Sequence, residues 1–320
     1  MKNKNGVMSV NAIIEKITEQ IQEGIYPGAS LALYRDGQWS EHYLGLADPE
    51  KGESVVADLV YDLASVSKVV GVANICAFLY AKGELALDRP FKELYPRFAH
   101  EKTTIRELLT HTSGLDPFIP NRDQLDARQL KTALENLQLK EDKSFHYTDV
   151  NFLLLGFWLE DRFHQPLDRL FEELIFTPWK MTETRFGPVE KAVPTVRGLA
   201  SGSVHDPKAR VLGCHAGSAG LFSTVADLER FLEHYLKDDF ARDLSQNFAR
   251  EEGKTRALGW NLEGDWLDHT GYTGTFIMYN RKRQEAVIFL SNRTYEKDER
   301  AQWILDRNSL MDLIKQECEK

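Results

Sequence analysis

The sequence predicts an α+β fold in which an antiparallel sheet is built from both ends of the chain and flanked by helices, with a helical lobe inserted between them. Strand-like alternation occurs near the N-terminus and again in the last third of the chain, whereas the stretch between has helical periodicity and proline breakers. We therefore expect an α/β sheet domain from residues 1–84 and 187–320, and an inserted all-helical lobe from residues 85–186.

The first expected elements are an amphipathic helix and a hairpin. The apolar residues of the helix recur at helical spacing: Ile13, Ile14, Ile17 and Ile21. This pattern stops at Gly24, and residues 29–48 then alternate around Asp36-Gly37, a dipeptide typical of a tight hairpin turn. Two antiparallel strands should therefore follow the first helix.

The later elements return to the sheet. A helix is expected within residues 219–236, opened by Ser223 or Thr224 as its N-cap. The segments that then predict strands are residues 256–263, 275–281 and 285–292. Residues 301–316 predict a last helix, so helices from both chain ends should cover the sheet.

Composition and charge narrow the class of protein. The chain has 320 residues and a formal charge of -9, with acidic and basic residues mixed along its length and no basic block, which argues against nucleic acid as a partner. The N-terminal sequence lacks the apolar core of a secretory signal, and no stretch approaches a membrane span, so we expect a cytoplasmic protein. Cys76, Cys214 and Cys318 are too widely spaced for a disulfide framework or a zinc cluster.

The segment around Ser65 and Lys68 carries the first chemical signal. Residues 66–80 are apolar on nearly every face, so a helix there must be buried, and a serine and a lysine three residues apart share one of its faces. Burial and the helix N-terminus should lower the pKa of Lys68 and keep its amine mostly uncharged, so that it could accept a proton from the hydroxyl. The alternative is structural: Ser65 caps a core helix while Lys68 extends to water.

Two further motifs follow at wide separations: Tyr147-x-Asp149 ahead of an apolar helix, and His269-Thr270-Gly271 before a strand, where we expect the glycine to let a substrate approach the backbone closely. Together with Ser65-x-x-Lys68, the chain over about residues 10 to 300 resembles the serine hydrolase family of class C beta-lactamases, D-alanyl-D-alanine carboxypeptidases and related esterases. That resemblance implies a beta-lactamase/transpeptidase-like fold.

The resemblance also implies roles for individual residues. Ser65 would be the nucleophile, with Lys68 and Tyr147 as its proton-transfer partners. The backbone N–H groups of Ser65 and Tyr272 would form the oxyanion hole, and Asp149 would be a polar group facing the cleft, where the family more often has asparagine.

The third motif would shape the opposite wall of the cleft with His269, Thr270 and Gly271. A tyrosine is a poor base in water, and Lys68, together with His269 when it is protonated, would favour the phenolate of Tyr147.

The third motif also departs from the beta-lactamases, which carry lysine where this chain has His269, a group largely neutral at pH 7. With the possible negative charge of Asp149, this predicts a neutral or less carboxylate-dependent ester or amide and weak or no beta-lactamase activity. We expect a serine hydrolase with an acyl-enzyme, acting on a small-molecule ester, amide or peptide without metal or cofactor. The alternative is a non-catalytic, penicillin-binding-like sensor or binding module.

Rival sites are weaker. Ser218 lies in a sequence close to the nucleophile elbow of alpha/beta-hydrolases, but the segment before it is not an apolar strand, so a glycine-rich loop lining the cleft is expected instead. His111 should end a helix and bond locally. The remaining candidates are a loop cluster with no tight metal-ligand spacing and two tryptophans that could line the pocket: His205, Asp206, His215, Trp260 and Trp266.

Overall fold

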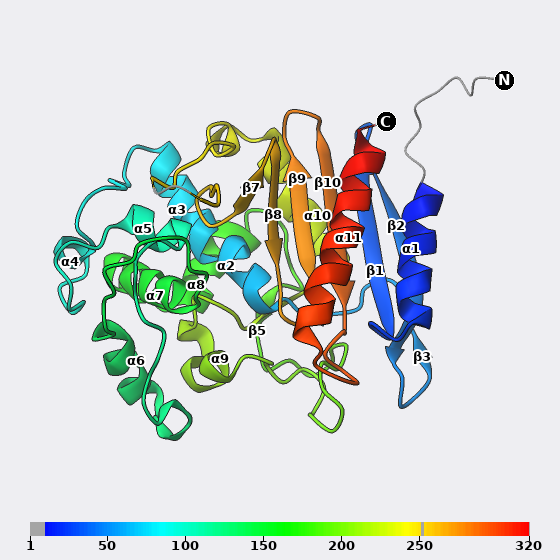
Figure 1. The fold of residues 1–320 in the computed structure, drawn as a ribbon, viewed down its shortest axis with the longest axis horizontal. Helices are drawn as coiled ribbons and strands as arrows, with labels where there is room; N and C mark the ends of the chain where they lie inside the picture. The colour runs from blue at the N-terminus through cyan, green and yellow to red at the C-terminus, as the bar shows by residue number, and fades with distance from the viewer. Residues whose placement is uncertain (1–9, 251–252, 320) are drawn as a thin grey trace.

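The computed structural model describes residues 10–250 and 253–319, and it confirms the α+β class (Figure 1). A seven-stranded antiparallel sheet has the order β3-β2-β1-β10-β9-β8-β7. Its strands are β1 (Gly28–Arg35), β2 (Gln38–Asp48), β3 (Glu53–Ser54), β7 (Asn261–Glu263), β8 (Trp266–Thr270), β9 (Phe276–Asn280) and β10 (Glu285–Ser291).

Both ends of the chain contribute to this sheet, as predicted. Strand β1 pairs with β2 through the expected hairpin, whose turn residues Asp36 and Gly37 both have positive φ, as a tight turn between twisted strands requires. On its other side β1 pairs with β10, with Ala32 opposite Ile288. The third motif, at the end of β8, is thereby held two strands away from β10 in a continuous ladder.

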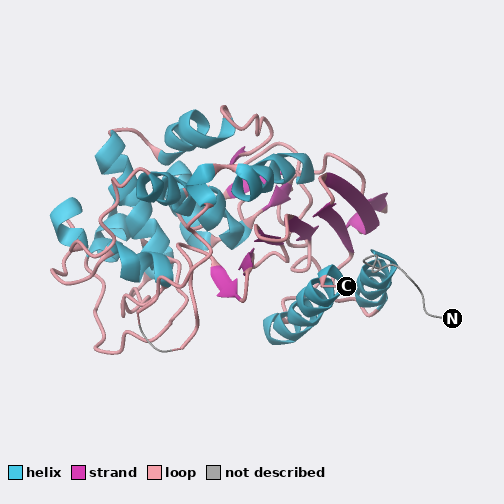
Figure 2. Ribbon diagram, turned by 90° about the horizontal axis from the view of Figure 1, so that it is seen from above, coloured by secondary structure: helices cyan, strands magenta, loops and turns pink. Residues whose placement is uncertain are grey.

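One face of the sheet is covered by α1 (Val10–Gln22) and α11 (Arg300–Cys318), the two helices that lie together at the labelled termini (Figure 2). Their buried apolar residues pack with those of the central strands as one cluster that includes Ile13, Ile17, Leu31, Phe289 and Ile314. Burial of such side chains contributes roughly 1.5–3 kcal/mol each, so the terminal helices are held by the sheet they cover.

The opposite face packs against α10 (Val225–Lys237) and, beyond it, the helical part of the molecule. The helices there are α2 (Ser67–Val70), α3 (Val72–Ala81), α4 (Phe91–Leu94), α5 (Ile105–Thr110), α6 (Ala127–Glu135), α7 (Val150–Phe163), α8 (Leu167–Phe171) and α9 (Pro207–Leu212). Short helical turns are η1 (Ala64–Val66), η2 (Arg122–Gln124), η3 (Glu172–Phe176), η4 (Gly213–His215) and η5 (Asp239–Ala241).

Residues 85–186, expected to be an all-helical lobe, contain helices α4 to α8 with two isolated β-bridges, Pro90–Thr104 and Leu115–Leu139, and end in two residues that are not helical. These form strand β5 (Arg185–Phe186), which joins β6 (Leu221–Ser223) and β4 (Tyr61–Asp62) in a small second sheet. Two residues carry too weak a pattern for a strand to be predicted. The boundaries of an independent lobe stay a prediction.

The apolar segment after Ser65 is a core element, and it is broken where one helix was expected. Helices α2 and α3 meet at Gly71, where a Cβ would lie 2.4 Å from the ring of Phe171. Ala64–Ala81 is long and apolar enough to cross a membrane by length and composition alone, so the expectation that no stretch approached this length was wrong; 78% of it is buried inside the protein, as in a core helix. The expectation about a secretory signal falls partly on residues 1–9, outside the described residues.

Candidate active site

Ser65 lies on the turn η1, directly after a strained residue. Ala64 has φ of +46°, in the left-handed region that non-glycine residues rarely adopt. The buried carboxylate of Asp62 accepts hydrogen bonds from the backbone N–H of Ala64 at 2.8 Å and of His205 at 2.7 Å. A buried carboxylate with two backbone donors therefore holds the nucleophile's turn in place.

The connection between β8 and β9 reaches this turn from the other side. The hydroxyl of Thr275 donates to the carbonyl of Leu63 at 3.1 Å, and that of Thr273 donates to the carbonyl of Asp62 at 2.9 Å. A Cβ at Gly271 would lie 2.6 Å from the Leu63 carbonyl oxygen. We expected this glycine to admit a substrate, but it admits the backbone of the nucleophile's turn.

Asp62 provides a pH-dependent test of this support. Burial raises the pKa of Asp62 to about 6, although the N–H groups of His205 and Ala64 act in the opposite direction. Because the pKa is higher in the folded than in the unfolded chain, the stability associated with this group is present below about pH 4 and is lost as pH rises through about 6. Thermal unfolding should show that the stability difference between wild type and Asp62→Asn changes by about 3 kcal/mol between these limits, and a difference independent of pH would contradict the assignment.

Lys68 donates three hydrogen bonds from a fully buried position. Its Nζ lies 2.8 Å from Ser65 Oγ, 2.7 Å from Asp149 Oδ1 and 2.9 Å from the carbonyl oxygen of Ser218. The last two groups only accept, so the remaining position of the amine faces the serine hydroxyl. The alternative in which Lys68 extends to water is therefore wrong.

The expected neutral state of Lys68 is also wrong. Burial alone lowers the pKa of Lys68, but the Asp149 carboxylate and Tyr147 outweigh burial and raise the pKa above its ordinary value. Burial likewise raises the pKa of Asp149, but Lys68 and Lys208 outweigh it and hold that pKa well below its usual range. The resting site thus contains an ammonium bound to a carboxylate, because the sequence reasoning did not weigh Asp149 as a direct partner.

Tyr147 stands at the cleft, 38% exposed, with its ring centroid 5.1 Å from Lys68 Nζ. His111 ends α5, as predicted, and it does so in a left-handed conformation. The expected local bonding of its ring is wrong, because its Nδ1 accepts a hydrogen bond from the distant Thr148 N–H at 3.3 Å. The His111 ring also packs 4.6 Å from that of Tyr147, so its role extends to supporting the second motif.

His269 is buried, with its ring 6.1 Å from that of Tyr147. Burial, then the charges of Lys68 and Arg256, lower the pKa of His269 well below its ordinary value, so the expected help from a protonated His269 is wrong. The second cation is Arg256 instead. Its guanidinium is fully buried and hydrogen-bonded to Asn261 and the Gly259 carbonyl, and although burial lowers its pKa to about 10, it stays charged at neutral pH.

The two expected oxyanion donors are free to bind. Within residues 10–250 and 253–319, the backbone N–H groups of Ser65 and Tyr272 donate to no protein acceptor. Both residues line the same two cavities, so the two N–H groups belong to one cleft. Free backbone donors beside a nucleophile are what stabilisation of a developing oxyanion requires.

The cleft extends to both sides of Ser65. One side is a cavity of about 940 Å³ whose walls include Phe118, Leu199 and Lys208. The other is a cavity of about 230 Å³, and no acidic residue lines it within the described part of the chain. Its cations are Lys254, Arg293, Arg300 and Arg307. The beta-lactamases carry a lysine where this chain has His269, and here the positive charge at the cleft comes from these four residues instead.

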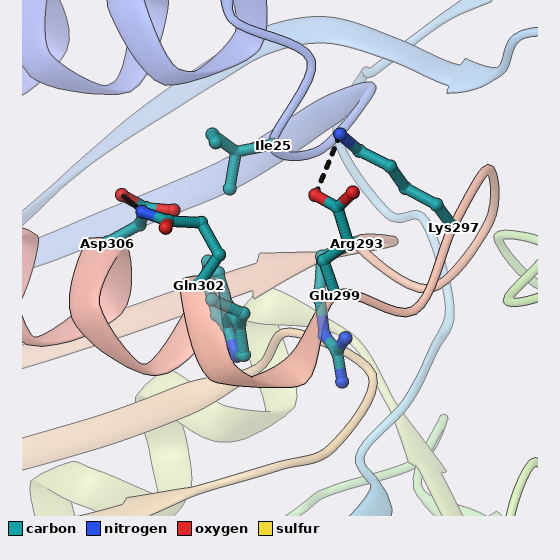
Figure 3. A pocket seen from close by; sticks show the side chains of 7 residues that line it. Ile25, Arg293, Lys297, Glu299, Gln302 and Asp306 are labelled. Atoms are coloured by element: carbon teal, nitrogen blue, oxygen red, sulfur yellow. Dashed lines mark hydrogen bonds and ion pairs between the residues drawn. The ribbon is translucent and has the colours of Figure 1, made fainter.

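A third hollow lies outside this cleft, beneath the start of α11 (Figure 3). Gln302 and Asp306 face Ile25 across it, and Lys297 pairs with Glu299 at its edge at 2.9 Å. Its volume is about 10 Å³, room for a water molecule and for no larger ligand.

The rival sites do not assemble. Ser218 is fully buried ahead of β6 and contributes its carbonyl to Lys68, so it cannot be an accessible nucleophile. Asp206 caps α9 while His215 pairs with Glu160, and no group of three potential metal ligands occurs in the described residues. Trp260 and Trp266 are core residues, and Trp303 lines the smaller cavity instead.

Sequence reasoning missed several cleft residues. Arg300 and Arg307 are seven apart in the last helix with Trp303 between them, a helical spacing that could have identified one face directed at the site. Lys208 and Arg256 have no comparable signal, because each reaches the site through tertiary packing alone.

Comparisons with known proteins agree with this arrangement. The beta-lactamase family model matches residues 13–310. A protein of Escherichia coli (strain K12) named as a D-alanyl-D-alanine carboxypeptidase is 28% identical over 363 aligned positions, covering 90% of this chain and 83% of that protein.

Solved structures support the fold. A beta-lactamase/D-alanine carboxypeptidase from Pseudomonas syringae superposes with a TM-score of 0.77 at 20% identity, covering 96% of this chain and 98% of that one. A class C beta-lactamase from Rhodobacter sphaeroides gives 0.70 at 20% identity, covering 94% and 99%. These likenesses confirm the expected beta-lactamase/transpeptidase-like fold, and with the family match they show that the chain belongs to the beta-lactamase family of serine hydrolases.

Proposed function

We propose that this protein hydrolyses an amide or ester through a covalent acyl-enzyme at Ser65. The observation that carries the proposal is the contact of Lys68 Nζ with Ser65 Oγ at 2.8 Å, beside Tyr147 and two free backbone donors. Ser65, Lys68 and Tyr147 are the groups we assign to the chemistry, and the backbone of Tyr272 to the oxyanion.

The proposed reaction starts with attack of Ser65 Oγ on the substrate carbonyl carbon. The hydroxyl proton passes to the phenolate oxygen of Tyr147, the new carbon–oxygen bond forms, and the carbonyl oxygen takes up the negative charge. The bond to the leaving group then breaks, and the leaving group takes the proton from Tyr147. Water repeats the sequence on the acyl-enzyme and releases the acid. Lys68, whose Nζ lies 5.1 Å from the centroid of the Tyr147 ring, and the buried Arg256 are the cations beside this proton transfer.

The smaller cavity suggests which substrates fit. Lys254, Arg300 and Arg307 form no ion pair with any described residue, and Arg307 donates to Thr270 Oγ1 at 3.1 Å, next to the third motif. Unpaired cations in a cavity without acidic residues favour a carboxylate. In place of the neutral or less carboxylate-dependent substrate expected from the sequence, we propose a substrate with a free carboxylate near the scissile bond, such as a peptide ending in D-alanine. This agrees with the names of the relatives.

Labelling with a fluorophosphonate probe tests the nucleophile. Wild type should be labelled covalently, and Ser65→Ala should show no label by intact-mass spectrometry, because the probe reacts only with an activated serine. A label on Ser218 would overturn the assignment. If esters acylate Ser65 but the acyl group is never released with any ester tried, the result would favour the non-catalytic sensor or binding module.

A substrate panel tests the carboxylate. A peptide ending in D-alanyl-D-alanine should be cleaved at least about tenfold faster in kcat/KM than the same peptide with a C-terminal amide, and Arg307→Met should remove this preference. Equal rates for the two peptides would contradict the carboxylate, and a chromogenic cephalosporin in the same panel measures the weak or absent beta-lactamase activity that we propose. Our proposal of a cytoplasmic location is tested separately by cell fractionation.

A further inference from the structure

Asp149 is shared by two lysines from different elements. Its Oδ1 accepts from Lys68 on α2 at 2.7 Å, and its Oδ2 lies 3.0 Å from Nζ of Lys208 on α9. The Lys208 side chain is only 14% exposed, although it is at the wall of the larger cavity. Such a buried second cation needs a reason, because desolvating an ammonium is costly unless it is well paired.

The reason lies in the charge balance at Ser65. The Lys68 cation favours negative charge on the groups around it, but the adjoining Asp149 carboxylate cancels that field. Where the family has asparagine in place of Asp149, no such cancellation occurs. With a second lysine on the far oxygen of the carboxylate, Lys68, Asp149 and Lys208 together carry one net positive charge.

We infer that Lys208 is a positioning residue that offsets the negative charge of Asp149, so that Lys68 keeps a net positive field at Ser65 and Tyr147. The inference rests on the proposed function, because it concerns how readily Ser65 loses its proton. Lys208 acts through Asp149 and not by touching the reacting atoms, and its second pair, with Asp206 Oδ2, is longer at 3.6 Å.

The charged and titratable groups around the cluster all enter the expected pH dependence. Those that interact with Asp149 or Lys208 are Lys68, His111 and Asp206. The other charged and titratable residues that line the larger cavity with them are Asp116, Arg122, Tyr147, His205, Arg210, Tyr272, Asp298 and Arg300. Asp206 also caps α9 by accepting from the Ala209 N–H at 2.8 Å, which fixes its carboxylate to the helix end. The pKa of His111 is lowered well below its ordinary value by burial and by Arg256, so His111 adds no charge.

The test measures the rate of Ser65 labelling by a fluorophosphonate between about pH 5 and about pH 10. In the plot of labelling rate against pH, Lys208→Met should move the rise on the acid side (the acid limb) up by about one pH unit. Below that rise labelling should be about tenfold slower, because the group that accepts the Ser65 proton loses its own proton less readily without the second cation. Asp149→Asn should move the limb down. The double variant Asp149→Asn/Lys208→Met should return toward wild type, and Lys208→Arg should keep the wild-type limb.

A surface lysine provides the matched control. Lys282→Met removes a lysine paired with Asp265 at 3.2 Å on an exposed hairpin and should leave the limb in place. The inference is overturned if the acid limb of Lys208→Met is unshifted. It is also overturned if the double variant is no nearer to wild type than Asp149→Asn, and this comparison decides the matter even if Lys208→Met does not fold. A wild type without label overturns the proposed function, and the inference with it, whereas normal wild-type labelling with unshifted variants overturns the inference alone.

Discussion

Replacing Lys68 with methionine should lower kcat/KM by about 10²- to 10³-fold, the range for removing a group that stabilises developing negative charge. Methionine has a similar length but neither charge nor donors, so Ser65 Oγ loses its partner at 2.8 Å and Tyr147 loses the cation that lies over its ring. The same change leaves the carboxylate of Asp149, which is 24% exposed, with Lys208 alone. We therefore also expect a loss of about 3 kcal/mol in the free energy of unfolding, the lower end for a broken buried pair because one partner remains.

A second variant separates catalysis from stability. In Lys68→Met/Asp149→Asn the Asp149 charge is gone and Lys208 keeps Asp206 at 3.6 Å, so denaturant unfolding should recover most of the lost stability while kcat/KM stays low. Recovery of activity together with stability would mean that Lys68 serves only the fold. Activity of Lys68→Met within about tenfold of wild type would contradict a catalytic role for the Lys68 cation.

Local pattern predicted part of the fold: it missed strand β8 (Trp266–Thr270), and the strand expected over residues 256–263 is confined to Asn261–Glu263. The hairpin at Asp36-Gly37, the first helix and the sheet from both chain ends depend on periodicity and turn chemistry, which act over a few residues. The spacing of the three motifs was enough to indicate the family, because that spacing reflects one shared topology.

Charge states could not be predicted in the same way. Burial alone would keep Lys68 neutral, which is why the sequence predicted that state. The protonation of Lys68 depends instead on Asp149, 81 residues away, and on Lys208 beyond it. His269 was expected to be largely neutral, and burial beside two cations holds it neutral more firmly than its ordinary pKa would. Buried electrostatics is a property of tertiary contacts, so the sequence could name the groups without assigning their charges.

Backbone conformation at the nucleophile was equally unpredictable. An alanine at φ of +46° has no local signal, since alanine favours helix, and it persists only because Asp62 and the residues after β8 surround it. The close approach of Gly271 to the Leu63 carbonyl explains why a glycine stands at that position. The sequence indicated that a glycine was needed there, but the chain that approaches it is the protein's own.

Gly271→Ala should therefore impair catalysis much more than stability. The new Cβ would lie 2.1 Å from Thr275 Oγ1 and 2.6 Å from the Leu63 carbonyl oxygen, so the turn that carries Ser65 must move away from β8. A displacement of about 1 Å between the nucleophile and the Tyr272 N–H should lower kcat/KM about 100-fold, with an overpacking cost of roughly 1–3 kcal/mol.

Gly264→Ala is the control for that cost. Gly264 lies in the β7–β8 turn with φ of +57° and open space around its Cβ position, so alanine there should destabilise the protein by about 1–2 kcal/mol through backbone strain alone. Because the end of β8 next to Ser65 is not displaced, kcat/KM should stay within about threefold of wild type. If both variants lose stability and activity in the same proportion, activity follows global stability, and the close approach of β8 to the nucleophile's turn has no separate part in positioning Ser65.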